Sequence, residues 1–225
     1  MKGFTKLKNL CLEFLTAGLD FLGGPLLLFF LRSRGIRTYA ASQFFQYPVE
    51  VLKQTLLISI CFFLIFGAFL LALRKNFLKS MGLEISGSFQ IGCVSVLILL
   101  LVMAAAFAVR RTEDPRQIFW NLCYYVFIIG LPEEFVFRGA CPWLLRSFPW
   151  QVRYLLPNFL FAMIHVVAFG RFEPLTSEIF SEFLLTQMPG LMASGCCLQL
   201  MKERTGTLWT SILLHGLMDF SILFL

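Results

Sequence analysis

Long apolar stretches without charged residues constrain this chain more than any other feature. The clearest is residues 54–73, QTLLISICFFLIFGAFLLAL, which is long enough to cross the hydrocarbon core of a bilayer as one helix. The chain of 225 residues is 58% apolar and 14% charged, whereas a soluble domain is about 45–50% apolar and about 25% charged. This composition predicts an all-α fold, a polytopic bundle of membrane helices.

Six further apolar segments lie along the chain, which gives about seven predicted transmembrane helices. Helices should kink or restart near Pro132 and Pro189, because proline cannot donate a backbone hydrogen bond. No repeat, low-complexity tract or soluble domain appears, so we expect residues 1–225 to form a single integral membrane domain. The seven segments cover residues 9–31, 54–73, 89–109, 117 onward, 153–169, 178–201 and 207–225.

The charged residues between these segments indicate which partners the protein meets. The net charge of +6 comes from small basic clusters such as Arg110, Arg111 and Arg116. Clusters at helix ends are typical of anchors to lipid headgroups, so they predict membrane lipids as partners and no nucleic acid. None of the seven cysteines forms a C-x-x-C pair, and they are expected to be small buried hydrophobes. The short chain favours a prokaryotic cytoplasmic membrane.

The C-terminal half contains ionisable side chains inside its apolar segments. Such groups are costly in a membrane and are therefore functional candidates. Both histidines of the chain are among them. The set consists of Glu133, Glu134, Arg138, His165, His215 and Asp219.

The spacing of these residues predicts which of them pair. Glu134 and Arg138 are four apart, with Glu first, which is the favourable order for an ion pair on one helix face. Glu133 points about 100° away from Glu134 and is left to face a cavity. Two further pairs have the same four-residue spacing: His215 with Asp219, and Phe161 with His165. The depths of Glu133, His165 and His215 differ by roughly 10 Å, which helix tilt or a kink at Pro132 would absorb.

Three short motifs in this half resemble those of a known family. EEFVFR (133–138) matches E-E-x-x-x-R, FAMIH (161–165) matches F-x-x-x-H, and HGLMD (215–219) matches H-x-x-x-N/D. In their order and apolar setting they are similar to the CAAX prenyl protease and bacteriocin-processing family of intramembrane proteases, also called Abi proteins. The resemblance covers residues 117–225, which would be the catalytic core helices. Residues 1–116 would be accessory helices.

The resemblance implies a fold, a reaction and roles for named residues. The fold is a helix bundle with an internal hydrated cavity, and the reaction is hydrolysis of a peptide bond near the C-terminus or in a membrane segment. The substrate is a hydrophobic or lipidated protein or peptide. In this resemblance Glu133 activates a water, His165 and His215 orient it or stabilise charge, and Asp219 supports the oxyanion or the geometry. Glu134 and Arg138 complete the first motif, and Phe161 begins the second.

The sequence leaves several alternatives open. Glu133, His165 and His215 are also the ligand types of a zinc site, in which case Glu134 could serve as the base, although the glutamate mechanism without a cofactor is favoured. Many members of the family have Asn where this chain has Asp219. Asp219 could instead orient His215 or serve a metal as a ligand or second-shell partner. A non-catalytic scaffold or bacteriocin-immunity protein of the same fold, or a proton-relaying transporter, would also contain buried ionisable groups.

Overall fold

The computed structural model describes residues 8, 11–12, 15–16, 18, 27–39, 43–84, 114–169 and 176–222. Every regular element within these residues is a helix, which confirms the all-α prediction. The predicted span 89–109, and much of the one at 9–31, lie outside the described residues.

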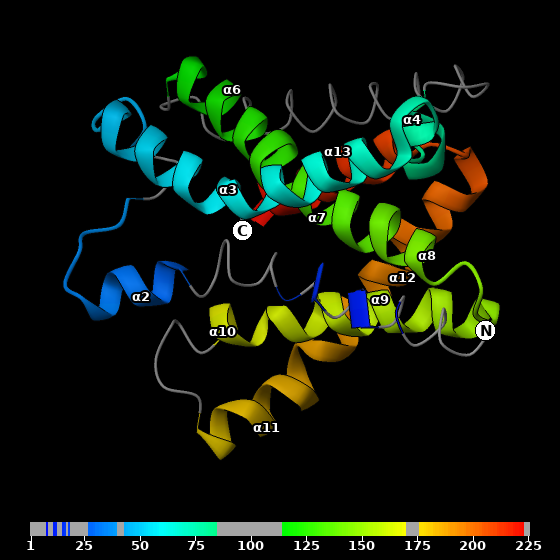
Figure 1. Ribbon diagram of the computed structural model, residues 1–225. Helices are drawn as coiled ribbons and strands as arrows, with labels where there is room; N and C mark the ends of the chain where they lie inside the picture. Colours follow the sequence, from blue (N-terminus) through cyan, green and yellow to red (C-terminus); the bar gives the residue numbers. More distant parts are fainter. Residues whose placement is uncertain are drawn as a thin grey trace.

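The helices form two groups along the chain (Figure 1). The first group consists of α2 (Leu27–Ser33), α3 (Pro48–Leu73), the short 3-10 helix η3 (Arg74–Asn76) and α4 (Phe77–Met81). The second consists of α6 (Pro115–Cys123), η4 (Tyr124–Gly130), α7 (Leu131–Glu134), η5 (Phe135–Ala140), α8 (Cys141–Leu144), α9 (Trp150–Ile164), α10 (Val166–Phe169), α11 (Ser177–Thr186), α12 (Met188–Thr205) and α13 (Leu208–Ile222).

The segments α6 to α8 form one uninterrupted helical path, drawn in green in Figure 1. Asp114 caps its start by accepting a hydrogen bond from the backbone N–H of Arg116 at 2.9 Å. Two stretches of the path, η4 and η5, are π-helical, and each ends shortly before a proline, Pro132 or Pro142. The wider π turns accommodate residues that lack a backbone N–H. The predicted restart near Pro132 is thus a change of helix type, because Gly130 keeps helical torsions.

Two other segments are divided between helices, one at the predicted position and one where the sequence predicted no interruption. The sixth segment is divided at Gln187 into α11 and α12, and Pro189 stands in the first turn of α12, as the sequence predicts. The fifth segment is divided at His165, which ends α9 and precedes α10. His165 therefore stands at the junction of the two helices.

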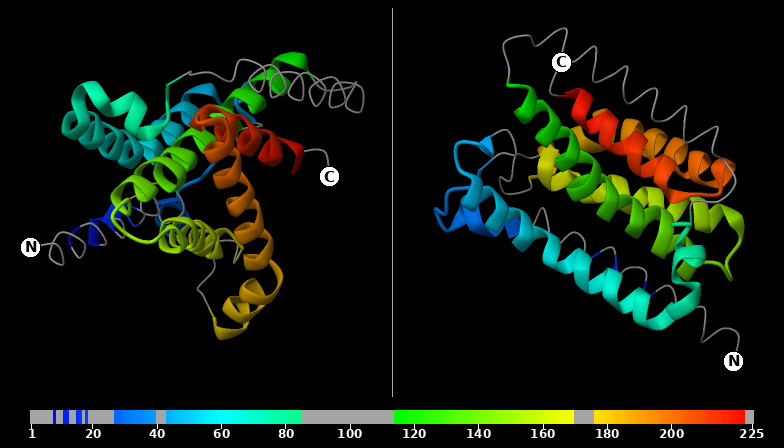
Figure 2. Two further views of the ribbon diagram at one scale, coloured as in Figure 1. Left: turned by 90° about the vertical axis from the view of Figure 1, so that its right-hand side faces the viewer. Right: turned by 90° about the horizontal axis from the view of Figure 1, so that it is seen from above.

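The helices of the second group pack side by side, with α12 against α9 and α13, and α13 against η4 (Figure 2). The crossing of α13 and η4 is very close. A Cβ atom on Gly216 would lie 2.6 Å from the Cα of Val126, and one on Gly130 would lie 3.1 Å from the carbonyl oxygen of Ile212. Two glycines therefore let these backbones approach. Because Gly216 follows His215, this crossing brings His215 against α7.

The first group of helices holds the second through aromatic contacts. The fully buried ring of Phe135 lies 5.1 Å from the ring of Phe66 and 6.0 Å from that of Phe77. At the end of α4, the backbone N–H of Leu208 donates to the carbonyl of Gly82 at 2.6 Å. Residues of α3 and α4 thus support the segment that carries Glu133 and Glu134.

In the described part of the chain, no single helix is both long and apolar enough to cross a membrane. The two arms of α3, Pro48–Leu57 and Phe62–Leu73, are bent by 47° and satisfy the requirement only as a pair. The count of seven spans stays a prediction.

Candidate active site

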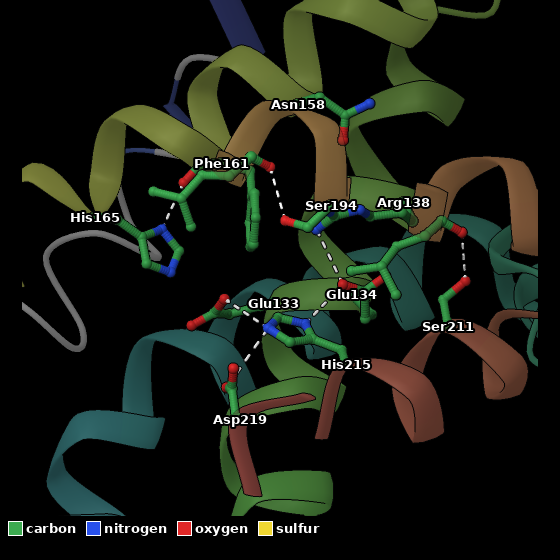
Figure 3. Close-up of polar contacts among 12 residues, drawn as sticks. Glu133, Glu134, Arg138, Asn158, Phe161, His165, Ser194, Ser211, His215 and Asp219 are labelled. Atoms are coloured by element: carbon green, nitrogen blue, oxygen red, sulfur yellow. Dashed lines mark hydrogen bonds and ion pairs between the residues drawn. The ribbon is translucent and has the colours of Figure 1, made fainter. Parts of the chain in front are cut away.

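The centre of the bundle contains an ion pair that is completely sealed from solvent. Glu134 Oε1 lies 3.0 Å from Nη1 of Arg138, one helical turn further on, and both side chains have no exposed surface. The four-residue spacing predicted this pair. The same Oε1 lies 2.8 Å from Nδ1 of His215, which comes from α13 (Figure 3). Glu134 therefore joins two helices and fixes the orientation of the imidazole.

The other nitrogen of His215 faces two further carboxylates. Its Nε2 lies 3.7 Å from Oε2 of Glu133 and 3.6 Å from Oδ2 of Asp219. The side chains of these two residues are 20% and 27% exposed, whereas that of His215 is 5% exposed. The pairing of His215 with Asp219 follows their spacing on α13. Glu133 and Asp219 thus form the part of the cluster that solvent or a substrate can reach.

His165 is held by its own helix. Its Nδ1 lies 2.7 Å from the carbonyl oxygen of Phe161, and a carbonyl can only accept, so Nδ1 carries the proton and donates it (Figure 3). In the neutral ring this assignment leaves a lone pair on Nε2. His165 and His215 therefore both use Nδ1 for anchoring, and the Nε2 atom of each remains for chemistry.

The ring of Phe161 connects the members of the cluster. Its centroid lies 4.8 Å from the ring of His165 and 5.6 Å from that of His215, in edge-to-face geometry with both. The guanidinium carbon of Arg138 lies 4.1 Å from the same centroid, which is a cation–π contact. Phe161 thus sets the spacing of the two imidazoles and covers the sealed ion pair. The sequence predicted its contact with His165 but not the other two.

Asn158 and Gly195 are two residues that the sequence did not single out. Asn158 is buried on α9, and its Nδ2 donates to the carbonyl of Tyr154 at 2.7 Å. A Cβ atom on Gly195 of α12 would lie 2.7 Å from Asn158 Oδ1 and 2.9 Å from Arg138 Nη2. The absence of a side chain at Gly195 therefore lets α12 close over both polar groups. In the sequence, only the Asn within an apolar helix could have pointed to this contact. The close approach of two helices cannot be read from a single sequence.

A metal site would need several ligand side chains that point to one position. Across residues 114–169 and 176–222, and in the other described segments, no three His, Cys, Asp or Glu side chains are arranged to hold a metal ion. The choice between the glutamate mechanism and the zinc alternative stays a prediction.

The C-terminal part of the chain matches a known family. Residues 115–221 match the family model described as "Type II CAAX prenyl endopeptidase Rce1-like". The matched segment includes all three motifs and every residue of the cluster. No curated protein and no solved structure matches the chain.

Proposed function

Starting from the membership of residues 115–221 in the Rce1-like type II CAAX prenyl endopeptidase family, we propose that this chain is an intramembrane endopeptidase in which Glu133 activates the attacking water. The family implies a protease that is embedded in a membrane. The mechanism, the substrate and the roles of individual residues are our proposal.

The observation that carries the proposal is the difference between the two adjacent glutamates. Glu134 is sealed and is engaged by Arg138 and His215, so it cannot meet a substrate. Glu133 is partly exposed, and its buried Oε2 has no hydrogen-bond partner among the described residues. A carboxylate that is accessible and not consumed by structural bonds is suited to accept a proton from water.

The proposed reaction uses the two imidazoles beside this carboxylate. Glu133 accepts one proton of the water, and the Nε2 lone pair of His165 accepts a hydrogen bond from its other O–H. The water oxygen attacks the carbonyl carbon of the scissile peptide bond and forms a tetrahedral oxyanion. His215, held through Nδ1 by Glu134, stabilises this charge when its Nε2 carries a proton. Collapse breaks the C–N bond, and Glu133 returns the proton to the leaving amine.

Exposed apolar side chains support a location inside the membrane. Large apolar side chains on α3 are strongly exposed, among them Leu64 at 66% and Leu71 at 77%. Another on α11, Leu185, is 80% exposed. Apolar surface of this extent is stable against lipid chains, whereas water would disfavour it. The expected substrate is a hydrophobic or lipidated protein or peptide, cleaved near its C-terminus or in a membrane segment, in a prokaryotic cytoplasmic membrane.

Mass spectrometry of candidate membrane peptides, with and without lipidation, tests the proposal. The purified protein is incubated with each peptide, and the products identify the bond that is cleaved. We expect cleavage that is lost in Glu133→Gln, that is lost or reduced in His215→Ala, and that persists in the presence of a chelator. A loss of cleavage on chelation that zinc restores would contradict the glutamate mechanism. A folded protein that binds peptides without cleaving any would indicate a scaffold or immunity protein.

A further inference from the structure

A polar cavity lies away from the cluster of Glu133 and the two histidines. It has a volume of about 510 Å³. It lies where α4, α8, the start of α9 and the end of α12 come together, at the right-hand side of Figure 1. Gly139, which lines it, stands six residues after Glu133 on the same helical path, and this corresponds to roughly 9 Å along a helix. The cavity is therefore separate from the proposed reaction site.

Two cations line this cavity. Arg153 and Lys202 both line it, and neither forms an ion pair within 4 Å among the described residues. The charge of Lys202 is attracted by Glu203 and, less strongly, repelled by Arg153. The one carboxylate of the lining, Glu203, accepts a hydrogen bond from the buried Gln199 at 2.9 Å. The lining thus keeps an excess of one positive charge. Adjacent cations are unfavourable unless an anion lies between them.

The position of Lys202 is fixed by packing rather than by an anion. Its Cε lies 3.3 Å from the place that a Cβ on Gly82 would occupy, so its apolar stem crosses the end of α4. The side chain is half-buried. Packing of the stem holds the ammonium group at the cavity before any ligand binds, and such preorganisation lowers the entropic cost of binding.

We propose that this cavity binds the phosphate group of a phospholipid headgroup, with Arg153 and Lys202 as its two charged donors. Aromatic side chains border it, as is typical of the interface between lipid chains and headgroups: Trp143 lies under the guanidinium of Arg146 at 3.8 Å, and Trp150 is 63% exposed. The inference rests on the membrane location in the proposed function. It does not depend on hydrolysis.

Native mass spectrometry of the full chain in detergent tests the site. The probes are phosphatidylglycerol, a diacylglycerol with the same acyl chains, and inorganic phosphate as a competitor. We expect the protein to retain phosphatidylglycerol and not diacylglycerol. Arg153→Gln combined with Lys202→Gln should weaken retention by about tenfold or more, because two charge-assisted hydrogen bonds are lost. Lys79→Gln combined with Arg204→Gln removes the same charge from exposed positions outside the cavity and should leave retention unchanged.

The outcomes separate the sources of the ligand. Displacement of the lipid by millimolar inorganic phosphate would support the phosphate site and assign it to a soluble phosphate. Equal retention of diacylglycerol, or unchanged retention in the Arg153 and Lys202 variant, would overturn the proposal. A rise in KM for a cleaved peptide with unchanged lipid retention would also overturn it and assign the cavity to the peptide. Glu133→Gln should bind the lipid normally, so failure of the protease proposal would be seen independently.

Discussion

Glu133 and Glu134 are neighbours in the chain, yet they lie in two regions with opposite properties. Glu134 and Arg138 form a sealed region in which every charge has its counterpart and no surface is exposed. Glu133 and Asp219 form an accessible region beside His215. His215 connects the two, with Nδ1 in the first and Nε2 in the second. Of the two carboxylates in the first motif, Glu134 therefore stabilises the site, and Glu133 is left to react.

The largest expected effect on hydrolysis is that of Glu133→Gln. The amide keeps the size of the side chain but cannot accept a proton from water, so kcat should fall by about 10²–10⁴-fold, the range typical of general bases. Thermal unfolding of the purified protein should be unchanged, because Glu133 is partly exposed and is not in the sealed ion pair. Peptide cleavage and thermal denaturation are measured on the same preparation. A variant that cleaves at the normal rate would refute the assignment of the base.

In contrast to Glu133→Gln, Glu134→Gln should mainly lower the stability of the protein. It leaves the guanidinium of Arg138 in a sealed site without its counter-charge, which should cost about 3 kcal/mol or more in free energy of unfolding. Denaturant titration in detergent measures this loss. Adding Arg138→Met should recover part of it, because an apolar side chain needs no counter-charge there. Equal stability of Glu134→Gln and the wild type would show that the sealed pair does not hold the fold.

The division between these regions was only partly predictable from the sequence. Spacing within one helix identified the pair of Glu134 with Arg138 and that of His215 with Asp219, since a helix places residues four apart on one face. The bond from Glu134 to His215 joins residues 81 positions apart and depends on how α7 and α13 cross. That crossing is set by Gly130 and Gly216, whose closeness to neighbouring backbone is a tertiary property.

Tertiary contacts also explain why the sequence predicted neither the helix type around Pro132 nor the role of Asn158. Proline predicts an interruption but does not say whether the chain breaks, as it does at Gln187, or widens into π turns. Asn158 gains its importance from a glycine on another helix, Gly195. Residue type and local spacing therefore gave the all-α class and the motif residues, whereas the contacts between helices required the structure.

Gly195→Ala tests whether the side chains in the sealed region can move without loss of stability or activity. The new methyl group would meet Asn158 Oδ1 and Arg138 Nη2 at less than 3 Å, so one of them must move. We expect a loss of about 1–3 kcal/mol in stability, as for overpacked cores. A reduced kcat should accompany it, because displacing Arg138 moves Glu134 and His215.

Gly190→Ala is the matched control on the same helix. A Cβ on Gly190 has nothing within 4 Å, so this substitution should stabilise α12 slightly through the higher helix propensity of alanine. Both variants are compared by thermal unfolding and by kcat. If Gly195→Ala behaves like Gly190→Ala in both measurements, the close packing over Arg138 is not needed for the site.

Asp219→Asn should have the smallest effect, and it distinguishes the two roles left open for this residue. If Asp219 orients His215, an amide oxygen can still accept a hydrogen bond from Nε2, and kcat should fall by less than about tenfold, the value of one ordinary hydrogen bond. If an oxyanion donor is required at this position, Asn supplies an N–H and kcat should rise, as the Asn of many family members suggests. Asp219→Ala removes both possibilities and should reduce kcat in either case. Comparing kcat for Asp, Asn and Ala at position 219, at one pH, therefore shows whether this position in the accessible region acts as a hydrogen-bond acceptor or as a donor.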